Sequence, residues 1–323
     1  MGMEQEEVVG CDGQQHASTQ QRCEKRRVYA ISDLHVDYAE NMEWVRSFAD
    51  AGGAHQRDAL IVAGDVSDDL ALLQAALEIL CAGFYSVHFC PGNHDLWKCR
   101  KKKGSNRCSD STEKLRRVNA ICRELGVHIV PHLFAGRVWI VPQFSWYAGK
   151  LRGGRDVPSL DGGMLCAWMD FSNCVFPNVG PSIEFTGRNV GAKLAEAKLI
   201  DDFFLSKNNN TGDEFDYDAL RTSPYPVITF SHFVPRYDLN PSQEWLLFKE
   251  LDAVSVSPSL DALVRKAGSS VHVYGHTHIP RDKIIDRVRY VSHPLGYPRE
   301  SAYCTVRKRD ASDFVVWEVG SSF

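Results

Sequence analysis

The sequence lacks any long uninterrupted run of apolar residues. No stretch of it approaches the length and apolarity of a membrane-spanning helix. Residues 1–7, MGMEQEE, also lack the apolar core of a secretory signal peptide. We therefore expect a chain that has no membrane association and is cytoplasmic, with the nucleus as the alternative compartment.

An excess of positive charge is absent as well. The 37 Lys and Arg residues are outnumbered by 41 Asp and Glu residues, and the formal net charge is -4. Bulk charge therefore gives no reason to expect nucleic acid as a partner, although a local basic patch could still bind it. Ten cysteines are present, but without a secretory route we interpret most of them as reduced thiols.

Apolar residues are plentiful enough for a substantial core. With 323 residues and 44% hydrophobic content, the chain can form one large domain or two small ones. Residues 1–26 have almost no periodic apolar positions, which predicts a flexible tail. We expect residues 27–323 to form a single domain. The segment around 142–226 opens with a stretch that lacks a clear period, which indicates a cap or insertion over the site.

Strands and helices are expected to alternate in the first part of the chain. Apolar spacing predicts helices over 41–51, 70–81 and 191–205, and a further helix that Asp110 caps and that ends at Leu125. Such alternation with short apolar strands predicts a parallel sheet. Strands are also expected at 128–130 and 138–141. Those expected near residues 227, 271, 289, 303 and 314 outnumber the helices there and predict a second, partly antiparallel sheet.

Five of the apolar segments end in side chains that can bind metals. They span residues 28–35, 59–65, 87–95, 227–232 and 271–278. Since the carboxyl ends of such strands meet at one edge of a sheet, we expect these side chains to converge. The candidate ligands are Asp33, His35, Asp65, Asn93, His232, His276 and His278. A set of carboxylate, imidazole and amide groups suits Mn, Fe or Zn better than Ca, which prefers oxygen ligands only.

The order of these motifs resembles the calcineurin-like metallophosphoesterase superfamily. Asp-x-His, Gly-Asp, Gly-Asn-His-Asp, a lone His and Gly-His-x-His follow one another from Arg27 onward. Each motif alone would be weak, but five in order, each after an apolar strand, are specific. The resemblance implies an α/β fold of four layers, α/β/β/α, with two mixed sheets. It also implies two divalent metal ions and a phosphorylated small molecule or nucleotide as the substrate.

The resemblance further implies a role for each matching residue. Asp65 would bridge the two metals, and metal-bound hydroxide would attack the phosphorus of a phosphomonoester or phosphodiester. His94 would be the general acid for the leaving group, and Asp95 would orient the His94 imidazole. One metal would take Asp33, His35 and His278, and the other would take Asn93, His232 and His276.

Departures from the family pattern narrow the choice among the branches of the superfamily. Serine/threonine protein phosphatases carry an Arg after the second motif, and purple acid phosphatases carry a metal-binding Tyr where Asp68 stands. Both branches are therefore disfavoured. A nuclease stays an alternative because the basic run 98–107 could track a nucleic-acid backbone, but the run has no interleaved aromatics. A catalytically silent, metal-stabilised interaction module is the alternative outside the enzymes.

Several further residues have simple structural explanations. Cys99 and Cys108 are expected to be free thiols, because a closed zinc site would need a second pair. Arg236 and Arg299 either reach a phosphate oxygen or form surface ion pairs. No role is assigned to four histidines that packing or surface exposure would explain, His88, His128, His132 and His272.

Overall fold

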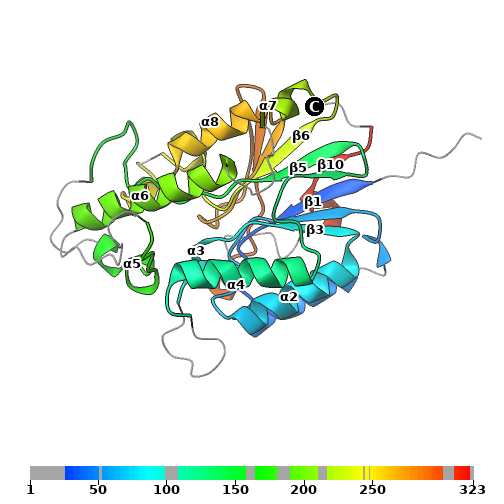
Figure 1. Cartoon of the computed structure of the whole chain (residues 1–323), viewed down its shortest axis with the longest axis horizontal. Coiled ribbons are helices and arrows are strands. Elements are labelled where there is room, and N and C mark those ends of the chain that lie inside the picture. Colours follow the sequence, from blue (N-terminus) through cyan, green and yellow to red (C-terminus); the bar gives the residue numbers. More distant parts are fainter. Residues whose placement is uncertain are drawn as a thin grey trace, which may run out of the picture.

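The computed structural model describes nine stretches of the chain (Figure 1). They are residues 26–50, 53–98, 108–157, 164–179, 190–209, 217–242, 244–246, 248–300 and 309–320. The expected tail except Arg26, the basic run after Lys98, Cys99 and the strand expected near Tyr303 lie outside these residues. Cys108 is a free, buried thiol, as predicted.

The first sheet contains four strands in the order β10-β1-β2-β3. The last three of these are parallel, and β10 is antiparallel to β1. Their bounds are Val315–Glu318 for β10, Arg27–Ile31 for β1, Ala59–Val62 for β2 and Ser86–Phe89 for β3. One face packs against three helices, α1 (Ala39–Asp50), α2 (Leu70–Gly83) and α4 (Ser111–Glu124).

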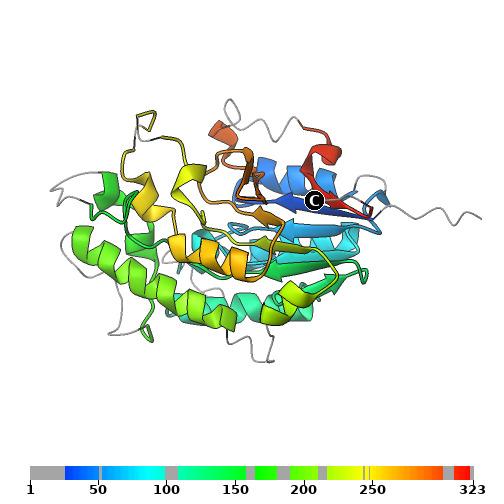
Figure 2. The ribbon, with the colours of Figure 1, turned by 90° about the horizontal axis from the view of Figure 1, so that it is seen from above.

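The second sheet contains six strands in the order β4-β5-β6-β7-β9-β8. Parallel pairs in the middle are flanked by antiparallel pairs at both edges. The strands are β4 (His132–Phe134), β5 (Val138–Pro142), β6 (Val227–Phe230), β7 (Val271–Val273), β8 (Arg281–Ile285) and β9 (Val288–Ser292). On the outside lie α6 (Val190–Asn209), α7 (Tyr217–Thr222) and α8 (Pro258–Lys266) (Figures 1 and 2).

The two sheets pack face to face through apolar side chains. Ala30 and Ile61 of the first sheet belong to one buried cluster with Ile140, Ile228 and Val271 of the second. Helices cover the outer face of each sheet, so the molecule has the four layers that the family resemblance implies (Figure 1). Alternate side chains of a strand point to opposite faces of its sheet, and both faces are covered here, which is why a central strand such as β2, with the sequence ALIV, is apolar throughout.

Most of the expected elements are present. The helices expected over 41–51, 70–81 and 191–205 correspond to α1, α2 and α6. Asp110 caps α4 because its Oδ1 accepts a hydrogen bond from the backbone N–H of Glu113 at 2.8 Å. The Glu113 carboxylate closes the turn by accepting from the N–H of Ser109 at 2.6 Å.

Four strand assignments differ from the expectation, and one of them is β4, which lies at 132–134 where no strand was expected. The strand expected at 128–130 is reduced to a single bridge between His128 and His88. The last strand, β10, joins the first sheet and not the second. Strand β8 was not expected, because its charged, exposed sequence RDKII has no apolar period. Charged side chains are typical of an edge strand, where they oppose pairing with other chains.

The segment 142–226 supplies most residues of a separate apolar cluster. Trp146 and Phe176 pack with Phe204 of α6 and with Phe233, which follows β6. The helix α5 (Asp170–Asn173) and the turn before it belong to the same cluster. That this segment acts as a cap, and that residues 27–323 form one domain, stay predictions.

Candidate metal centre

All seven predicted ligands lie together at the carboxyl ends of strands. Two follow β1, one follows β2 and one opens the short helix α3 (Asn93–Leu96) after β3. The other three follow β6 and β7 of the second sheet. The site therefore spans the two sheets, with Asp65 in the middle. Its Oδ2 atom is 3.9 Å from His35 Nε2 and 3.4 Å from His232 Nε2.

On one side of Asp65, two imidazoles and a carboxylate face one another. His35 Nε2 and His278 Nε2 are 3.0 Å apart, and His278 Nε2 is 3.5 Å from Asp33 Oδ1. Ligand atoms about 2.1 Å from a common ion stand roughly 3 Å from one another. The three groups are therefore spaced as the ligands of one divalent ion.

On the other side, an amide and two imidazoles face one another in the same way. Asn93 Oδ1 is 3.1 Å from His232 Nε2 and 3.0 Å from His276 Nδ1, and the two imidazole nitrogens are 3.2 Å apart. Two ligand groups that share Asp65 fit two divalent ions. The division between them is the one that the family resemblance implies.

Outer hydrogen bonds determine which nitrogen each imidazole presents to the centre. His232 Nδ1 lies 2.9 Å from the carbonyl of Ala63, and His276 Nε2 lies 2.8 Å from the carbonyl of Val254. His278 Nδ1 lies 2.7 Å from Glu300 Oε2. A ring nitrogen that donates outward carries the proton, so the lone pair of the other nitrogen points inward, as metal binding requires.

A buried carboxylate, Asp170, fixes the Asn93 amide. Its Oδ1 accepts from Asn93 Nδ2 at 2.9 Å and from Trp97 Nε1 at 2.6 Å, and its Oδ2 accepts from Trp168 Nε1 at 2.9 Å. The amide nitrogen is thereby held away from the centre, and the amide oxygen faces it. Burial raises the pKa of Asp170 to about 6, although these three donors oppose that rise.

Backbone strain is concentrated at the candidate ligands. Asp33, His35, Asp65, His276 and His278 have φ values of 53°, 41°, 57°, 74° and 54°, in the left-handed region that residues other than glycine rarely adopt. Three other described residues outside glycine share this conformation, Ala135, Asp286 and Arg287. Strain of this kind persists where the surrounding structure enforces it, and it clusters at functional sites.

Two glycines let the backbone pass directly beneath the ligands. A Cβ on Gly92 would lie 2.2 Å from Asp65 Oδ1, and a Cβ on Gly275 would lie 2.7 Å from Asp33 Oδ2. Neither contact is tolerable for a real side chain. The glycines of the third and fifth motifs are therefore needed for this close approach.

The buried charged groups of this site shift one another's pKa values. Burial would lower the pKa of His232, but the Asp65 carboxylate outweighs that effect and raises it to about 9. Burial would raise the pKa of Asp65, but the imidazoles around it, His232 first, hold it well below its usual range. Without a metal, the protonated His232 therefore balances the charge of Asp65, and a metal ion bound there would displace that proton.

His94 lies beside the centre. Its backbone N–H donates to Asp65 Oδ1 at 2.9 Å, and its ring stacks on Trp97 with centroids 3.6 Å apart. Its Nε2 is 3.4 Å from the hydroxyl of Tyr297. Burial lowers the pKa of His94 to about 4, so the imidazole is neutral at pH 7 unless a nearby anion raises its pKa.

The Asp95 carboxylate has other hydrogen-bond partners than the His94 imidazole that the resemblance implied. It accepts instead from four backbone N–H groups, those of Asp65, Val66, Ser67 and Gly92, at 2.8–3.0 Å. Because α3 turns this side chain beneath the loops, Asp95 holds two ligand-bearing loops against each other. Its place in the motif is explained by backbone positioning.

A cavity of about 290 Å³ opens over the centre. Candidate ligands form its floor, and its walls carry Trp97, Trp168 and Tyr297 with Met169 and Leu251. None of its described lining residues is Lys or Arg. Arg236 is engaged in ion pairs with Asp238 at 2.8 Å and Asp261 at 3.2 Å, and Arg299 lies over the Tyr297 ring. For Arg236, the ion-pair interpretation therefore applies.

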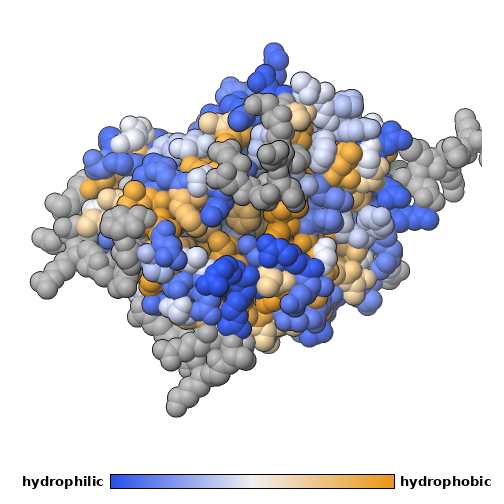
Figure 3. Space-filling view, in the orientation of Figure 1, coloured by the Kyte–Doolittle hydropathy of each residue, from blue (hydrophilic) through white to orange (hydrophobic). Residues whose placement is uncertain are grey.

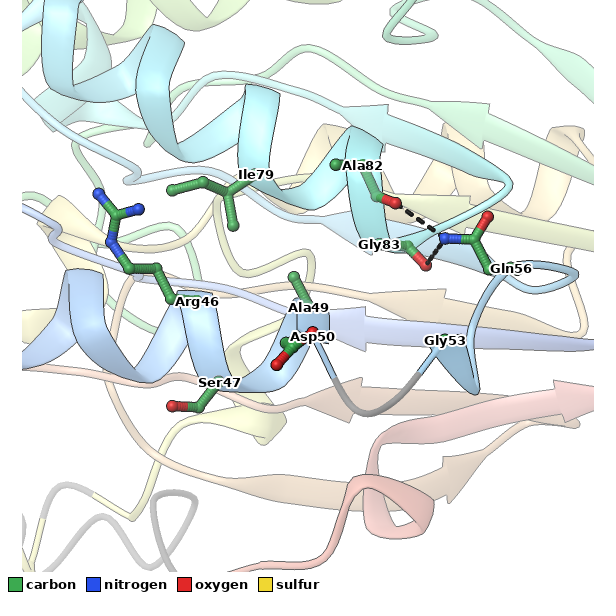
Figure 4. A pocket seen from close by; sticks show the side chains of 9 residues that line it. All are labelled: Arg46, Ser47, Ala49, Asp50, Gly53, Gln56, Ile79, Ala82 and Gly83. Carbon is green, nitrogen blue, oxygen red and sulfur yellow. Dashed lines mark hydrogen bonds between the residues drawn. The ribbon is translucent and has the colours of Figure 1, made fainter.

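The surface has a larger hollow elsewhere. About 570 Å³ in volume, it lies between the carboxyl ends of α1 and α2, where Gln56 donates to the carbonyl of Ala82 at 2.8 Å (Figure 4). None of the candidate ligands lines it. Volume therefore does not identify the site, whereas the ligand geometry does. Polar residues cover much of the face seen in Figure 3, with apolar residues gathered toward its middle.

Sequence reasoning missed the residues that position the ligands. The carbonyl groups of Ala63 and Val254 have no side-chain signature, and Asp170 lies in a segment without a period. Glu300 directly follows Arg299, which the sequence analysis had singled out, so its position beside Arg299 was the signal that could have pointed to it. The roles of the seven ligands and of His94 stay predictions.

The chain has two mixed sheets with grouped His and Asp side chains at their edge. Together with the match to a family model, this arrangement makes the chain a metal-dependent phosphoric ester hydrolase. The chain belongs to the calcineurin-like phosphoesterase family, whose model matches residues 26–280. The acyl-carrier-protein phosphodiesterase PptH of Mycobacterium tuberculosis is 26% identical over 289 residues, which cover 84% of this chain and 78% of that protein. This relative lies outside the two branches that the motif departures disfavoured.

One solved structure shows the same fold. The crystal structure of phosphopantetheinyl hydrolase (PptH) from Mycobacterium tuberculosis superposes with a TM-score of 0.63 at 22% identity, covering 92% of this chain and 97% of that one. A dimetal phosphatase from Danio rerio gives a TM-score of 0.43 at 13% identity, covering 82% and 86% of the two chains, a likeness too slight to support an argument. No helix in the described stretches is long and apolar enough to cross a membrane.

Proposed function

We propose that this chain hydrolyses a phosphodiester with two divalent ions, Mn, Fe or Zn, held at the candidate metal centre. The observation that carries the proposal is the pair of ligand groups that share Asp65, each with inward-facing atoms about 3 Å apart. Two ions so placed bind phosphate oxygens and lower the pKa of a water molecule. Asp33, His35 and His278 would hold one ion, and Asn93, His232 and His276 the other.

His94 supplies the proton that leaves with the alcohol. Its imidazole lies beside the centre and near the hydroxyl of Tyr297. Because burial lowers the pKa of His94, the negative charge of the bound phosphate is what raises that pKa and loads the proton. Burial raises the pKa of Tyr297, so its phenol stays protonated and can donate a hydrogen bond to the substrate.

The lining of the cavity favours a diester over a monoester. A phosphodiester carries one negative charge, and a phosphomonoester carries nearly two at pH 7. The described lining offers aromatic walls and no Lys or Arg, which suits a singly charged phosphate with an organic arm. The relative named above is an acyl-carrier-protein phosphodiesterase. A phosphopantetheinyl diester on a carrier protein is therefore the first substrate to test.

A substrate panel with metal analysis tests the proposal. The purified chain would be offered a phosphopantetheinylated carrier protein, simple phosphodiesters, phosphomonoesters, cyclic nucleotides, nucleoside diphosphates and short oligonucleotides. We expect diesters to be hydrolysed, and His94→Asn to lose most of that turnover while keeping the metal content of the wild type. Preference for oligonucleotides would favour the nuclease alternative. A metal-loaded chain without turnover on any substrate would favour the silent interaction module.

A further inference from the structure

Three histidines gather outside the candidate metal centre, where an edge of the first sheet meets an edge of the second. His88 lies in β3, the edge strand of the first sheet, and forms a parallel bridge with His128. His132 begins β4, the edge strand of the second sheet. The ring centroids are 4.8 Å apart for His88 and His128, 3.9 Å for His128 and His132, and 5.3 Å for His88 and His132.

Ordinary packing does not explain this cluster. The buried histidine of β7, His272, uses both ring nitrogens, with Nδ1 2.8 Å from Thr229 Oγ1 and Nε2 3.0 Å from Ser231 Oγ. His88 is also fully buried, but only its Nε2 has a partner, Ser86 Oγ at 3.2 Å. Its Nδ1 finds no hydrogen-bond partner among the residues that the structure describes, and neither does His132 Nδ1.

The unpartnered nitrogens have no hydrogen bond to lose if they bind an ion. Burial lowers the pKa of His88 well below its usual range and that of His128 to about 4, and it also lowers the pKa of His132. Neutral rings can stack at 3.9 Å without charge repulsion. Neutral imidazole is also the form that binds a metal, so no proton has to be displaced near pH 7.

We propose that His88, His128 and His132 form a third metal site, for a borderline divalent ion such as Zn²⁺ or Cu²⁺. One nitrogen from each ring lies within 4.8 Å of those of the other two. Around a tetrahedral ion these separations would shorten to about 3.3 Å. His128 and His132 are only partly buried, so their rings can rotate inward, and water can complete the coordination. Three imidazoles suit Zn²⁺ and Cu²⁺ rather than Mg²⁺ or Ca²⁺.

Such an ion would join the two sheets at their edges. His88 belongs to the first sheet and His132 to the second. Binding to the folded chain alone raises its stability by mass action. The site would therefore act structurally and leave the phosphoesterase chemistry unchanged.

Metal stoichiometry of the full chain, with any affinity tag removed, tests the proposal. Protein stripped with a chelator would be reconstituted with Zn²⁺, desalted and analysed for ions per chain. We expect three ions in the wild type and two in the His128→Gln, His132→Gln double variant, which leaves the buried His88 in place. Hydrolytic activity should be the same in both. Zn²⁺ should raise the melting temperature of the wild type further than that of the double variant.

A spectroscopic measurement on the wild type tests the same site and does not depend on whether the double variant folds. The two ion positions of the candidate metal centre would first be filled with Zn²⁺. One equivalent of Cu²⁺ added to the wild type should then show electron paramagnetic resonance hyperfine coupling to three imidazole nitrogens. Equal ion counts in the two proteins, or a Cu²⁺ spectrum without that coupling, would show that the cluster is only a stack of neutral histidines. These readouts do not depend on whether any phosphoester is hydrolysed, so they separate this site from the proposed function.

Discussion

Asp65 occupies the one position that both ligand groups share, and its two oxygens have different neighbours. Oδ2 faces His35 and His232, whereas Oδ1 accepts from the backbone N–H of His94. Asp65→Asn would keep the shape of the side chain but remove its charge. We expect less bound metal and a turnover lower by orders of magnitude, measured as ions per chain and as kcat/KM. Full metal content with ordinary activity would exclude the bridging role.

Asp170 should matter because it holds the Asn93 amide in one orientation. In Asp170→Asn, a single oxygen would face three N–H donors, and the Asn93 amide would lose its charged acceptor. Loss of such a positioning partner typically costs 10–100-fold in metal affinity or activity. We expect weaker metal binding on the Asn93 side, measured by chelator competition, together with a lower kcat.

Asp201 offers a matched control for that variant. It is also a fully buried carboxylate of the 142–226 segment, and it accepts from Ser257 Oγ at 2.9 Å and Trp146 N at 3.3 Å. It does not line the cavity over the centre. Asp201→Asn should therefore leave metal affinity unchanged. If both variants lost metal to the same extent, Asp170 would have no specific positioning role.

At the scale of an element, β7 shows how one strand serves two purposes. Val271 and Val273 enter the apolar layer between the sheets, and the chain beyond the strand carries His276 and His278. His272, on the opposite face, is hydrogen-bonded through both nitrogens, and burial lowers its pKa to about 3. It is therefore neutral in the folded chain over the whole range in which a free histidine takes up a proton.

That neutral histidine makes stability depend on pH. Below a pKa near 6.5 the unfolded chain binds a proton that the folded chain does not bind, so stability falls as pH decreases from about 6.5 toward 3. The slope is about 1.4 kcal/mol per pH unit for each such histidine. Urea unfolding with chelator present should show a shallower slope for His272→Gln between pH 6 and pH 4. An unchanged slope would mean that His272 takes up a proton in the folded state.

At the scale of the whole molecule, the chain closes on itself beside its first strand. The backbone carbonyl of Arg26 accepts from Val319 N at 2.9 Å, and Arg27 N donates to Asp58 Oδ1 at 2.8 Å. Residues 1–24 precede these contacts. Because that segment lacks apolar positions that could join the core, we expect its deletion to leave the melting temperature and the activity nearly unchanged.

A deletion through residue 27 is the matched control for that truncation. It would remove both of these hydrogen bonds and the first residue of β1, so the melting temperature should fall. Thermal unfolding and kcat of the three proteins, compared side by side, test the prediction. A large loss already in the shorter deletion would show that the amino-terminal segment packs on the folded chain.

The seven candidate ligands could be found from the sequence because each follows a short apolar run. A buried strand must be apolar, so a His, Asp or Asn at its end stands out against its neighbours. The same local signals located α1, α2 and the Asp110 cap of α4. These features depend on residues near one another in the chain, which is why pattern and motif order were sufficient for them.

Tertiary structure alone decided what surrounds those ligands. His35 and His278 meet across 243 positions, and Asn93 and Asp170 across 77. The Val254 carbonyl is chemically the same as every other carbonyl, so only its position selects the His276 nitrogen that faces inward. Likewise, the sequence placed Asp95 next to His94, but the turn of α3 sends its carboxylate to backbone N–H groups. Which groups meet across such distances depends on the packing of the layers, and local periodicity carries no record of it.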